Sequence, residues 1–213
     1  LLNGCGHQDG SEVHEAVLTL LILEKVNASY QCFSLNENQT HTLNHLTGEK
    51  EEKNRNMMIE SARIARGKIK KISDLDMNNF NTLIIPGGSG TASNFCNFAS
   101  QGTKMTVHKD ISKVILNTYN SKKPIGAVCI APILLASVLG AKGIKLTSGN
   151  HPEVRQVMQE LGAIHEICKK GECLEDVSNK IVTTPAYMYS DSTITEVLDG
   201  ILKMIMKIKK LCK

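Results

Sequence analysis

The residue best placed for chemistry in this sequence is a cysteine between an apolar run and a helix start. Residues 125–128 are short and apolar, which suits a buried strand, and Pro132 suits the first turn of a helix because its missing N–H costs nothing there. Cys129 lies at the turn between them. In such an elbow, N–H groups and the helix dipole favour thiolate over thiol, so Cys129 is a candidate nucleophile. The alternative is that Cys129 is a small buried hydrophobic residue.

An acidic residue forms the second candidate. Apolar residues recur at helical spacing from Val13 onwards, and Glu15 falls in the first turns of that expected helix, close to its apolar face. Ser11 or Asp9 is expected to cap the helix. A carboxylate so near the core side is unusual and indicates a role in a site. The alternative is that Glu15 turns to solvent or offsets the helix dipole.

Two glycine-containing loops follow expected strands. Pro86-Gly87-Gly88 ends a buried strand over 81–85, so its N–H groups can face a ligand, although a simple tight turn is the alternative. Gly149-Asn150-His151 follows a strand expected over 144–148. Ligands bind outside the carboxyl ends of strands in a parallel sheet. The convergence of these loops with Cys129 at one sheet edge therefore favours the functional interpretation of the cysteine.

Composition limits the classes of function. The chain has 213 residues, of which 41% are hydrophobic and 22% charged, which fits one globular domain over 1–213. With a net charge of +4, 4% aromatic residues and no basic run interleaved with aromatics, a nucleic-acid partner is not expected. No apolar run reaches membrane-spanning length and no signal peptide is visible, so no membrane partner is expected. Leu1-Leu2 resembles the end of a strand whose start lies upstream.

Cysteine usage bears on compartment and cofactors. The chain has seven cysteines, an odd number, at irregular spacings. This argues against a disulfide framework and for a reducing compartment. The expected location is the cytoplasm if the source is bacterial and the mitochondrial matrix if it is eukaryotic. Cys168 and Cys173 are the closest pair, but no histidine or second pair completes a zinc set. We therefore expect neither a metal nor another cofactor.

The order of elements predicts an α/β fold with a mostly parallel sheet covered by helices on both faces. Residues 36–56 are polar and are expected to form a surface excursion. A hairpin is a further possibility between the last two strands. The expected strands lie over 29–34, 81–85, 125–128, 144–148, 163–168 and 180–184, and the expected helices over 57–66, 107–119 and 191–211, with others starting near 13, 131 and 154.

Several stretches resemble the enhancing lycopene biosynthesis protein (ElbB) family of the class I glutamine amidotransferase-like superfamily, which is close to the PfpI proteases and the Parkinsonism-associated deglycases. The resemblance covers nearly the whole chain. It implies a flavodoxin-like three-layer α/β sandwich and a homodimer. The stretches that carry it are Asp9-Gly-Ser-Glu-Val-His-Glu-Ala-Val-Leu-Thr-Leu-Leu, Asn44-His-Leu-Thr-Gly-Glu, Glu60-Ser-Ala-Arg-Ile-Ala-Arg-Gly, Pro86-Gly-Gly, Asn97-Phe-Ala-Ser, Cys129-Ile-Ala-Pro and Lys180-Ile-Val-Thr-Thr-Pro-Ala-Tyr-Met.

The resemblance also implies roles for individual residues. Cys129 matches the nucleophile, and Glu15 matches the acidic partner on the first helix better than Glu12 does. Gly88 and the N–H of Ile130 match the oxyanion-hole positions.

Two further residues are weaker candidates. His151 lies about where the deglycase and glyoxalase relatives keep a catalytic histidine, although ElbB-type sequences do not keep it reliably. The run His151-Pro152-Glu153 also spells an amidotransferase motif, but it opens a helix soon after the elbow, so we interpret the match as coincidence. Cys5 precedes Glu15 in the same loop cluster and is either structural or a second reactive thiol.

The leading functional hypothesis is a cofactor-independent glyoxalase that acts on small α-oxoaldehydes such as methylglyoxal, with Cys129, Glu15 and His151 as catalytic candidates. Its link to isoprenoid synthesis comes from the resemblance. The second hypothesis is a binding or redox-sensing protein with an oxidisable Cys129. The third hypothesis is the glutaminase half of an amidotransferase. It is disfavoured because this sequence has no downstream His-x-Glu to complete the catalytic triad. Peptidase activity is a fourth.

Overall fold

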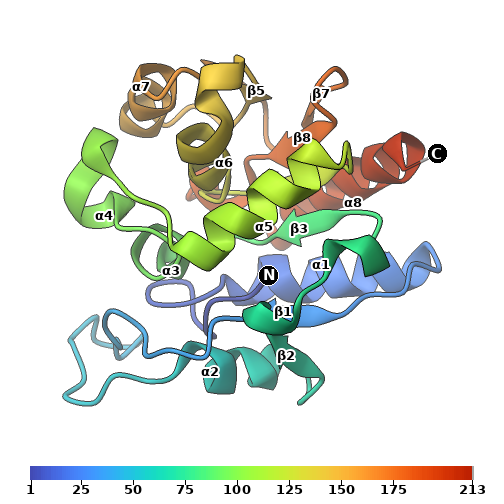
Figure 1. Cartoon of the computed structure of the whole chain (residues 1–213). Coiled ribbons are helices and arrows are strands. Elements are labelled where there is room, and N and C mark those ends of the chain that lie inside the picture. The colour runs from blue at the N-terminus through green and yellow to red at the C-terminus, as the bar shows by residue number, and fades with distance from the viewer. Residues whose placement is uncertain (213) are drawn as a thin grey trace.

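The computed structural model describes residues 1–212, and its helices enclose short strands from several sides (Figure 1). The elements alternate along most of the chain, as the sequence predicts. In chain order they are α1 (Val13–Lys25), β1 (Cys32–Ser34), α2 (Met57–Ile64), β2 (Ile69–Lys71), β3 (Leu83–Ile85), α3 (Ser89–Ser93), α4 (Phe98–Gln101), α5 (Lys109–Asn120), β4 (Ile125–Val128), α6 (Pro132–Leu139), β5 (Lys145–Leu146), α7 (Pro152–Glu160), β6 (Ile164–His165), β7 (Leu174–Asp176), β8 (Ile181–Thr184) and α8 (Ile194–Leu211).

The strands form one central sheet and two flanking pairs. The central order is β3-β4-β8-β7, with β1-β2 and β5-β6 as separate parallel pairs. Parallel pairing sets β4 between β3 and β8, with Ala127 opposite Ile85 and Thr183. All four residues of β4 are buried, which explains why this strand is an uninterrupted apolar run. The carboxyl ends of β3, β4 and β8 therefore meet at one edge.

The first two residues of the chain connect the central sheet with the β1-β2 pair. The N–H of Leu2 donates to the Phe33 carbonyl at 2.9 Å, and the terminal ammonium of Leu1 donates to the Ile84 carbonyl at 2.7 Å. Leu1-Leu2 thus bonds to β1 on one side and to β3 on the other, although the structure assigns no strand to these two residues.

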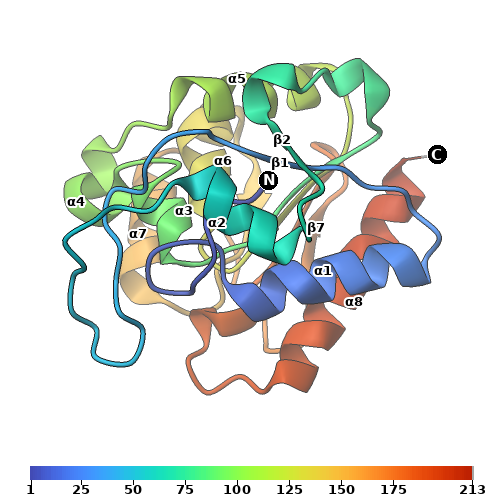
Figure 2. The same ribbon diagram turned by 90° about the horizontal axis from the view of Figure 1, so that it is seen from below.

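Helices cover both faces of the central strands. α1 and α8 lie side by side on one face, and α5 and α6 lie on the other (Figures 1 and 2). α1 begins as predicted, but its cap differs from the prediction. The Glu12 carboxylate, rather than Ser11 or Asp9, accepts the N–H of Glu15 at 2.7 Å, while the Ser11 hydroxyl accepts the N–H of Asn3.

Two parts of the strand prediction were wrong. The possible hairpin between the strands over 163–168 and 180–184 does not form, because β6 pairs in parallel with β5. The hairpin partner of β8 is β7, which runs antiparallel to it and which the sequence analysis missed together with β2. The excursion over 36–56 is confirmed, since it contains no helix or strand.

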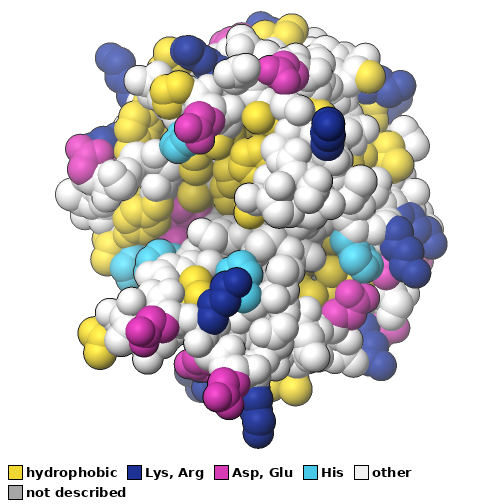
Figure 3. Space-filling model, turned by 90° about the vertical axis from the view of Figure 1, so that its left-hand side faces the viewer, with side chains coloured by type: hydrophobic (Ala, Val, Ile, Leu, Met, Phe, Trp, Pro, Cys, Tyr) yellow, Lys and Arg dark blue, Asp and Glu magenta, His cyan; other side chains and the backbone are white. Residues whose placement is uncertain are grey.

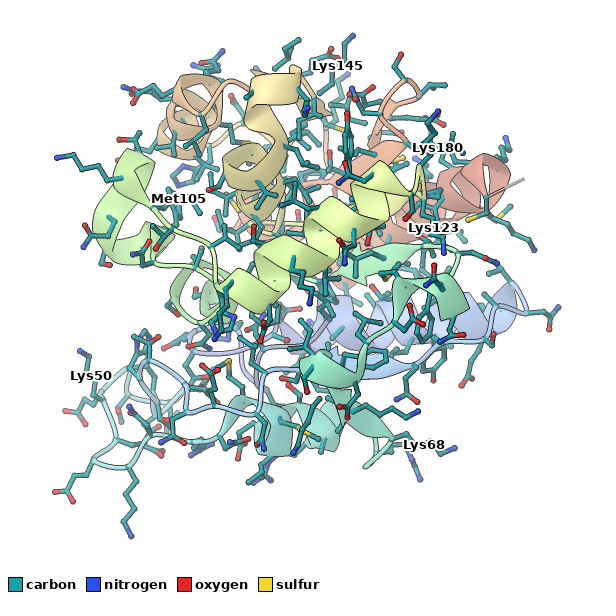
Figure 4. All side chains as sticks on the ribbon, in the orientation of Figure 1. Lys50, Lys68, Met105, Lys123, Lys145 and Lys180 are labelled. Atoms are coloured by element: carbon teal, nitrogen blue, oxygen red, sulfur yellow. The ribbon has the colours of Figure 1, made fainter. Side chains whose placement is uncertain are left out.

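Two lysines mark the amino ends of the central strands. Lys123 and Lys180 come just before β4 and β8 and lie on the same side of the molecule in Figure 4. Lys123 donates to the carbonyls of Met77 and Phe80, the latter at 2.7 Å. These residues are structural. The opposite ends of the same strands carry Cys129 and the segment after Thr184.

Candidate active site

Cys129 occupies the sharp turn that the sequence predicts between β4 and α6. Its φ is +62°, a left-handed conformation that a residue with a side chain adopts only when its surroundings hold it there. The N–H of Cys129 donates to the Thr184 carbonyl at 2.9 Å, which extends the pairing of β4 with β8 into the turn. The Cys129 side chain is 7% exposed. The strained turn therefore holds the sulfur at the carboxyl edge of the sheet.

A buried serine holds the other side of the elbow. The Ser148 hydroxyl donates to the Cys129 carbonyl at 3.0 Å, and the Ser148 N–H donates to Nε2 of the buried His165 at 3.2 Å. Because Nε2 of His165 accepts, this ring is held neutral, and burial lowers its pKa. Sequence reasoning named neither residue, because only the fold brings them behind the elbow.

Ser148→Ala is expected to destabilise the protein. The variant leaves the buried Cys129 carbonyl without this donor, and such a loss costs about 1–3 kcal/mol. Urea unfolding measures the difference in free energy. The control is Ser100→Ala, which removes an exposed hydroxyl bonded to the Asn97 carbonyl and should change the free energy by less than about 0.5 kcal/mol. Equal stability of both variants would show that Ser148 does not support the elbow.

Glu15 is fully buried, against the alternative that it turns to solvent. One carboxylate oxygen, Oε2, accepts the Gly87 N–H at 2.9 Å. The other, Oε1, accepts the Tyr187 N–H at 3.4 Å. The carboxyl group and the Cys129 side chain are neighbours on either side of Gly87, and each raises or lowers the pKa of the other. The structure thus joins Glu15, rather than Glu12, to the cysteine.

Burial dominates the protonation of this pair. It raises the pKa of Glu15 to about 8, with a contribution from the nearby Glu12 carboxylate, while the hydrogen bonds from Gly87, Tyr187 and Cys129 lower that pKa. Burial, followed by Glu15, also raises the pKa of the Cys129 thiol. The expectation that the elbow itself favours thiolate was therefore wrong for the resting protein, because desolvation outweighs the local N–H groups. Both side chains therefore keep their protons at neutral pH.

Two backbone N–H groups act on the Cys129 thiol. Those of Gly88 and Ile130 lower its pKa. Gly88 has φ +100° and lies against the loop before α1, where a Cβ would come within 2.3 Å of the Gly10 carbonyl oxygen. The two N–H groups that the resemblance assigns to an oxyanion hole thus surround the Cys129 side chain. Their role in catalysis stays a prediction.

Gly87 lies beside the Cys129–Glu15 pair. The sequence analysis assigned it no role of its own. A Cβ at this position would lie 2.5 Å from the Cys129 Cβ and 2.7 Å from Glu15 Oε2. Real side chains do not approach so closely, so only glycine lets the cysteine and the glutamate meet here. The Gly-Gly pair after a buried strand is the sequence signal for this close approach.

The structure does not join the two weaker candidates to the pair. His151 is exposed at the N-terminal end of α7, and within residues 1–212 it makes no side-chain hydrogen bond to Cys129 or Glu15. A catalytic role for His151 stays a prediction. Cys5 is half-buried, and burial raises the pKa of its thiol. All seven cysteines are free thiols.

The protonation of Glu15 predicts a pH dependence of stability. A carboxyl whose folded pKa is about 8, against 4.5 as the ordinary value, stabilises the fold below pH 4.5, and this contribution is lost as pH rises to about 8. Glu15→Gln removes that loss, so its Tm relative to the parent should rise between pH 5 and pH 9. Each kcal/mol is worth about 2–4 °C in a chain of this size.

Differential scanning calorimetry at several pH values checks this difference in Tm. The control is Glu24→Gln, which neutralises an exposed carboxyl on the same helix and should shift Tm by the same small amount at every pH. A pH-independent Tm difference for Glu15→Gln would contradict the protonation assigned to Glu15.

Figure 3 shows one face of the molecule, on which hydrophobic side chains line a hollow, acidic side chains lie within and beside it, and histidines lie at several points around it. A separate cavity of about 570 Å³ lies between α1, α8, β1 and β3, and neither Cys129 nor Glu15 lines it.

Two classes of feature are absent from the described part of the chain. Over residues 1–212, no cluster of three or more His, Cys, Asp or Glu side chains is arranged to hold a metal ion. Within the same residues, no helix is both long and apolar enough to cross a membrane.

Comparison with known proteins places this geometry in a family. The model of the DJ-1/PfpI family matches residues 9–188, a segment that contains Glu15, Gly88, Cys129 and Tyr187. The chain belongs to the DJ-1/PfpI family. Its fold is the flavodoxin-like α/β fold of that family.

Individual relatives refine this assignment. The chain is 40% identical to the mitochondrial ES1 protein homolog of Rattus norvegicus over 99% of this chain and 82% of that protein. It is 38% identical to the human mitochondrial glutamine amidotransferase-like class 1 domain-containing protein 3, over 99% and 81%. The crystal structure of an isoprenoid biosynthesis protein with an amidotransferase-like domain from Ehrlichia chaffeensis matches with a TM-score of 0.91 at 36% identity, covering 98% and 96%. The resemblance to the ElbB proteins is confirmed.

Proposed function

We propose that this DJ-1/PfpI protein is a cofactor-independent glyoxalase that converts small α-oxoaldehydes such as methylglyoxal into hydroxy acids. One observation carries the proposal. Cys129 stands in a strained elbow against a fully buried glutamate that retains a proton near neutral pH, and two N–H groups face its sulfur. A nucleophile, a proton carrier and an anion-stabilising pair are the groups that such a reaction requires.

The first step is addition. The reacting form of the pair is the one that has lost one proton. In it the Cys129 thiol passes its proton to ionised Glu15 as the sulfur attacks the aldehyde carbon and the C=O π bond breaks. The N–H groups of Gly88 and Ile130 hold the new oxyanion until it takes up that proton from Glu15. The product is a hemithioacetal. The thiol proton can pass to ionised Glu15 because the two side chains are neighbours beside Gly87.

The second step moves hydrogen between the two carbons. Ionised Glu15 removes the proton from the hemithioacetal carbon, which gives an enediolate. The hydroxyl proton then passes to the neighbouring oxygen, the C=O bond forms at the first carbon, and Glu15 returns its proton to the neighbouring carbon. The result is a thioester of the 2-hydroxy acid on Cys129. Water cleaves the carbon–sulfur bond, releases the hydroxy acid and restores the thiol, so the net reaction adds one water and needs no redox cofactor.

A steady-state assay of the purified protein tests the proposal, with methylglyoxal, glyoxal and glutamine offered side by side. We expect formation of lactate from methylglyoxal and of glycolate from glyoxal. Turnover of glutamine alone would replace the proposal with a glutaminase. Turnover of none of the three would favour a binding or redox-sensing role for Cys129.

We infer location and assembly from the relatives. A mitochondrial location is proposed for a eukaryotic source, because the rat and human relatives are named as mitochondrial proteins, and the cytoplasm for a bacterial source. A homodimer is proposed on the ElbB resemblance. A link to isoprenoid synthesis is proposed on that resemblance and on the name of the Ehrlichia protein. Size-exclusion chromatography with light scattering tests the homodimer.

A further inference from the structure

A tyrosine and a histidine form a contact beside the Cys129–Glu15 pair. Nδ1 of His14 and the hydroxyl of Tyr187 are joined by a hydrogen bond of 2.8 Å, and their rings lie 5.8 Å apart between centroids. His14 is on the exposed side of α1, and Tyr187 is half-buried. The hydrogen bond joins residues that are 173 positions apart in the chain, so it ties the start of α1 to the turn after β8.

The backbone of the same turn contacts Glu15. The N–H of Tyr187 donates to Glu15 Oε1 at 3.4 Å, which is long for such a bond and is easily broken by a small displacement of the turn. In Figure 2 this turn lies next to the first residues of α1. Tyr187 therefore contacts α1 twice, through its side chain at His14 and through its backbone at Glu15.

The turn after β8 has a strained backbone that its hydrogen bonds must hold in place. Ala186 has φ +43°, a strained conformation for a residue with a side chain. The Ser192 hydroxyl donates to the Ala186 carbonyl at 3.0 Å, and the Tyr189 hydroxyl donates to the Cys168 carbonyl at 3.0 Å. These bonds secure the far side of the turn. The side facing α1 is secured by the His14–Tyr187 hydrogen bond.

We propose that His14 and Tyr187 are positioning residues, and that their hydrogen bond holds the Tyr187 N–H on Glu15 and so sets how readily the Cys129–Glu15 pair gives up its first proton. The inference deepens the proposed function, because it concerns the same pair. Neither residue needs to touch the substrate. The groups that face Glu15 are Glu12 and the Cys129 thiol, together with the N–H groups of Gly87 and Tyr187.

The sign of the effect follows from charge. When the pair loses a proton, it carries one negative charge that N–H donors stabilise. Loss of the Tyr187 N–H removes one of them and raises the pH at which that proton leaves. The rate of Cys129 alkylation follows the thiolate, so its pH profile should move to higher pH.

The test is the pH profile of Cys129 alkylation by iodoacetamide, followed by mass spectrometry of the Cys129 peptide. In Tyr187→Phe and in His14→Ala the midpoint should rise by about half a pH unit or more. In His14→Asn, which keeps a hydrogen-bonding atom near the position of Nδ1, the midpoint should stay close to that of the parent. Tyr189→Phe is the matched control, since it removes a hydroxyl from the same segment without touching α1.

Three outcomes would overturn the proposal. In the first, the midpoints of Tyr187→Phe and His14→Ala coincide with that of the parent. In the second, Tyr189→Phe shifts the midpoint as much as Tyr187→Phe does. In the third, the midpoint of His14→Asn equals that of His14→Ala. His14 is exposed on a helix, so its variants remain informative if Tyr187→Phe unfolds. The readout needs no turnover: a parent without glyoxalase activity would refute the proposed function, and the alkylation profiles would still decide the positioning role.

Discussion

Cys129→Ala is expected to abolish conversion of methylglyoxal, because the covalent adduct requires the sulfur in the elbow. Glu15→Gln should keep the nucleophile but lose the proton transfer between carbons, a loss that typically costs about 10²–10⁴-fold in rate. Initial rates of lactate formation, normalised to folded protein, measure both effects. Cys96→Ala serves as the control, because it removes a buried thiol that donates to the Thr91 carbonyl and is not part of the pair.

His151→Ala tests whether His151 takes part in catalysis. The exposed position of His151, apart from the pair, predicts a loss of less than about tenfold, whereas a loss within the general acid–base range would make it a second proton carrier. Unchanged turnover in both Cys129→Ala and Glu15→Gln would contradict the enzymatic proposal, whatever the His151 result.

Gly87→Ala is expected to cost nearly as much activity as Glu15→Gln, although it adds a single methyl group. That methyl would lie 2.5 Å from the Cys129 Cβ and 2.7 Å from Glu15 Oε2, so the two side chains must move apart. It would also lie 2.9 Å from the Val128 carbonyl oxygen, and overpacking of this kind costs about 1–3 kcal/mol of stability. Turnover and urea unfolding measure the two effects separately.

The control for Gly87→Ala is a glycine far from the pair. Gly67 has φ +78°, and a Cβ there meets nothing within 4 Å, so Gly67→Ala strains the backbone without crowding any neighbour. It should lower the free energy of unfolding and leave turnover per folded molecule unchanged. If Gly87→Ala behaved in the same way, the close approach of Cys129 and Glu15 would not matter for the chemistry.

Features with a local cause could be predicted from the sequence. The strand over 125–128, the turn at Cys129 and the helix start at Pro132 depend on a few adjacent residues, and the structure has all three where the sequence indicates. β7 was missed because Leu174–Asp176 is short and mixed in polarity, so only its pairing with β8 makes it a strand.

Features with a long-range cause could not be predicted. Glu15 is buried because Gly87 and Tyr187, 72 and 172 residues further along, close over its carboxyl group. The same burial raises the pKa of the Cys129 thiol. The sequence shows only the local helix dipole and N–H groups, which lower that pKa. The contact between His14 and Tyr187 has no sequence signal, because it depends on where the turn after β8 meets α1.

The central claim is that the protons of Cys129 and Glu15 are coupled, so that the two side chains titrate as one unit. The most direct test is the rate of Cys129 alkylation as a function of pH in the parent and in Glu15→Gln, read from the Cys129 peptide by mass spectrometry. The account predicts two steps for the parent, one near the Glu15 pKa of about 8 and one above it, and a single step for Glu15→Gln. The same single step at the same pH in both proteins would contradict it.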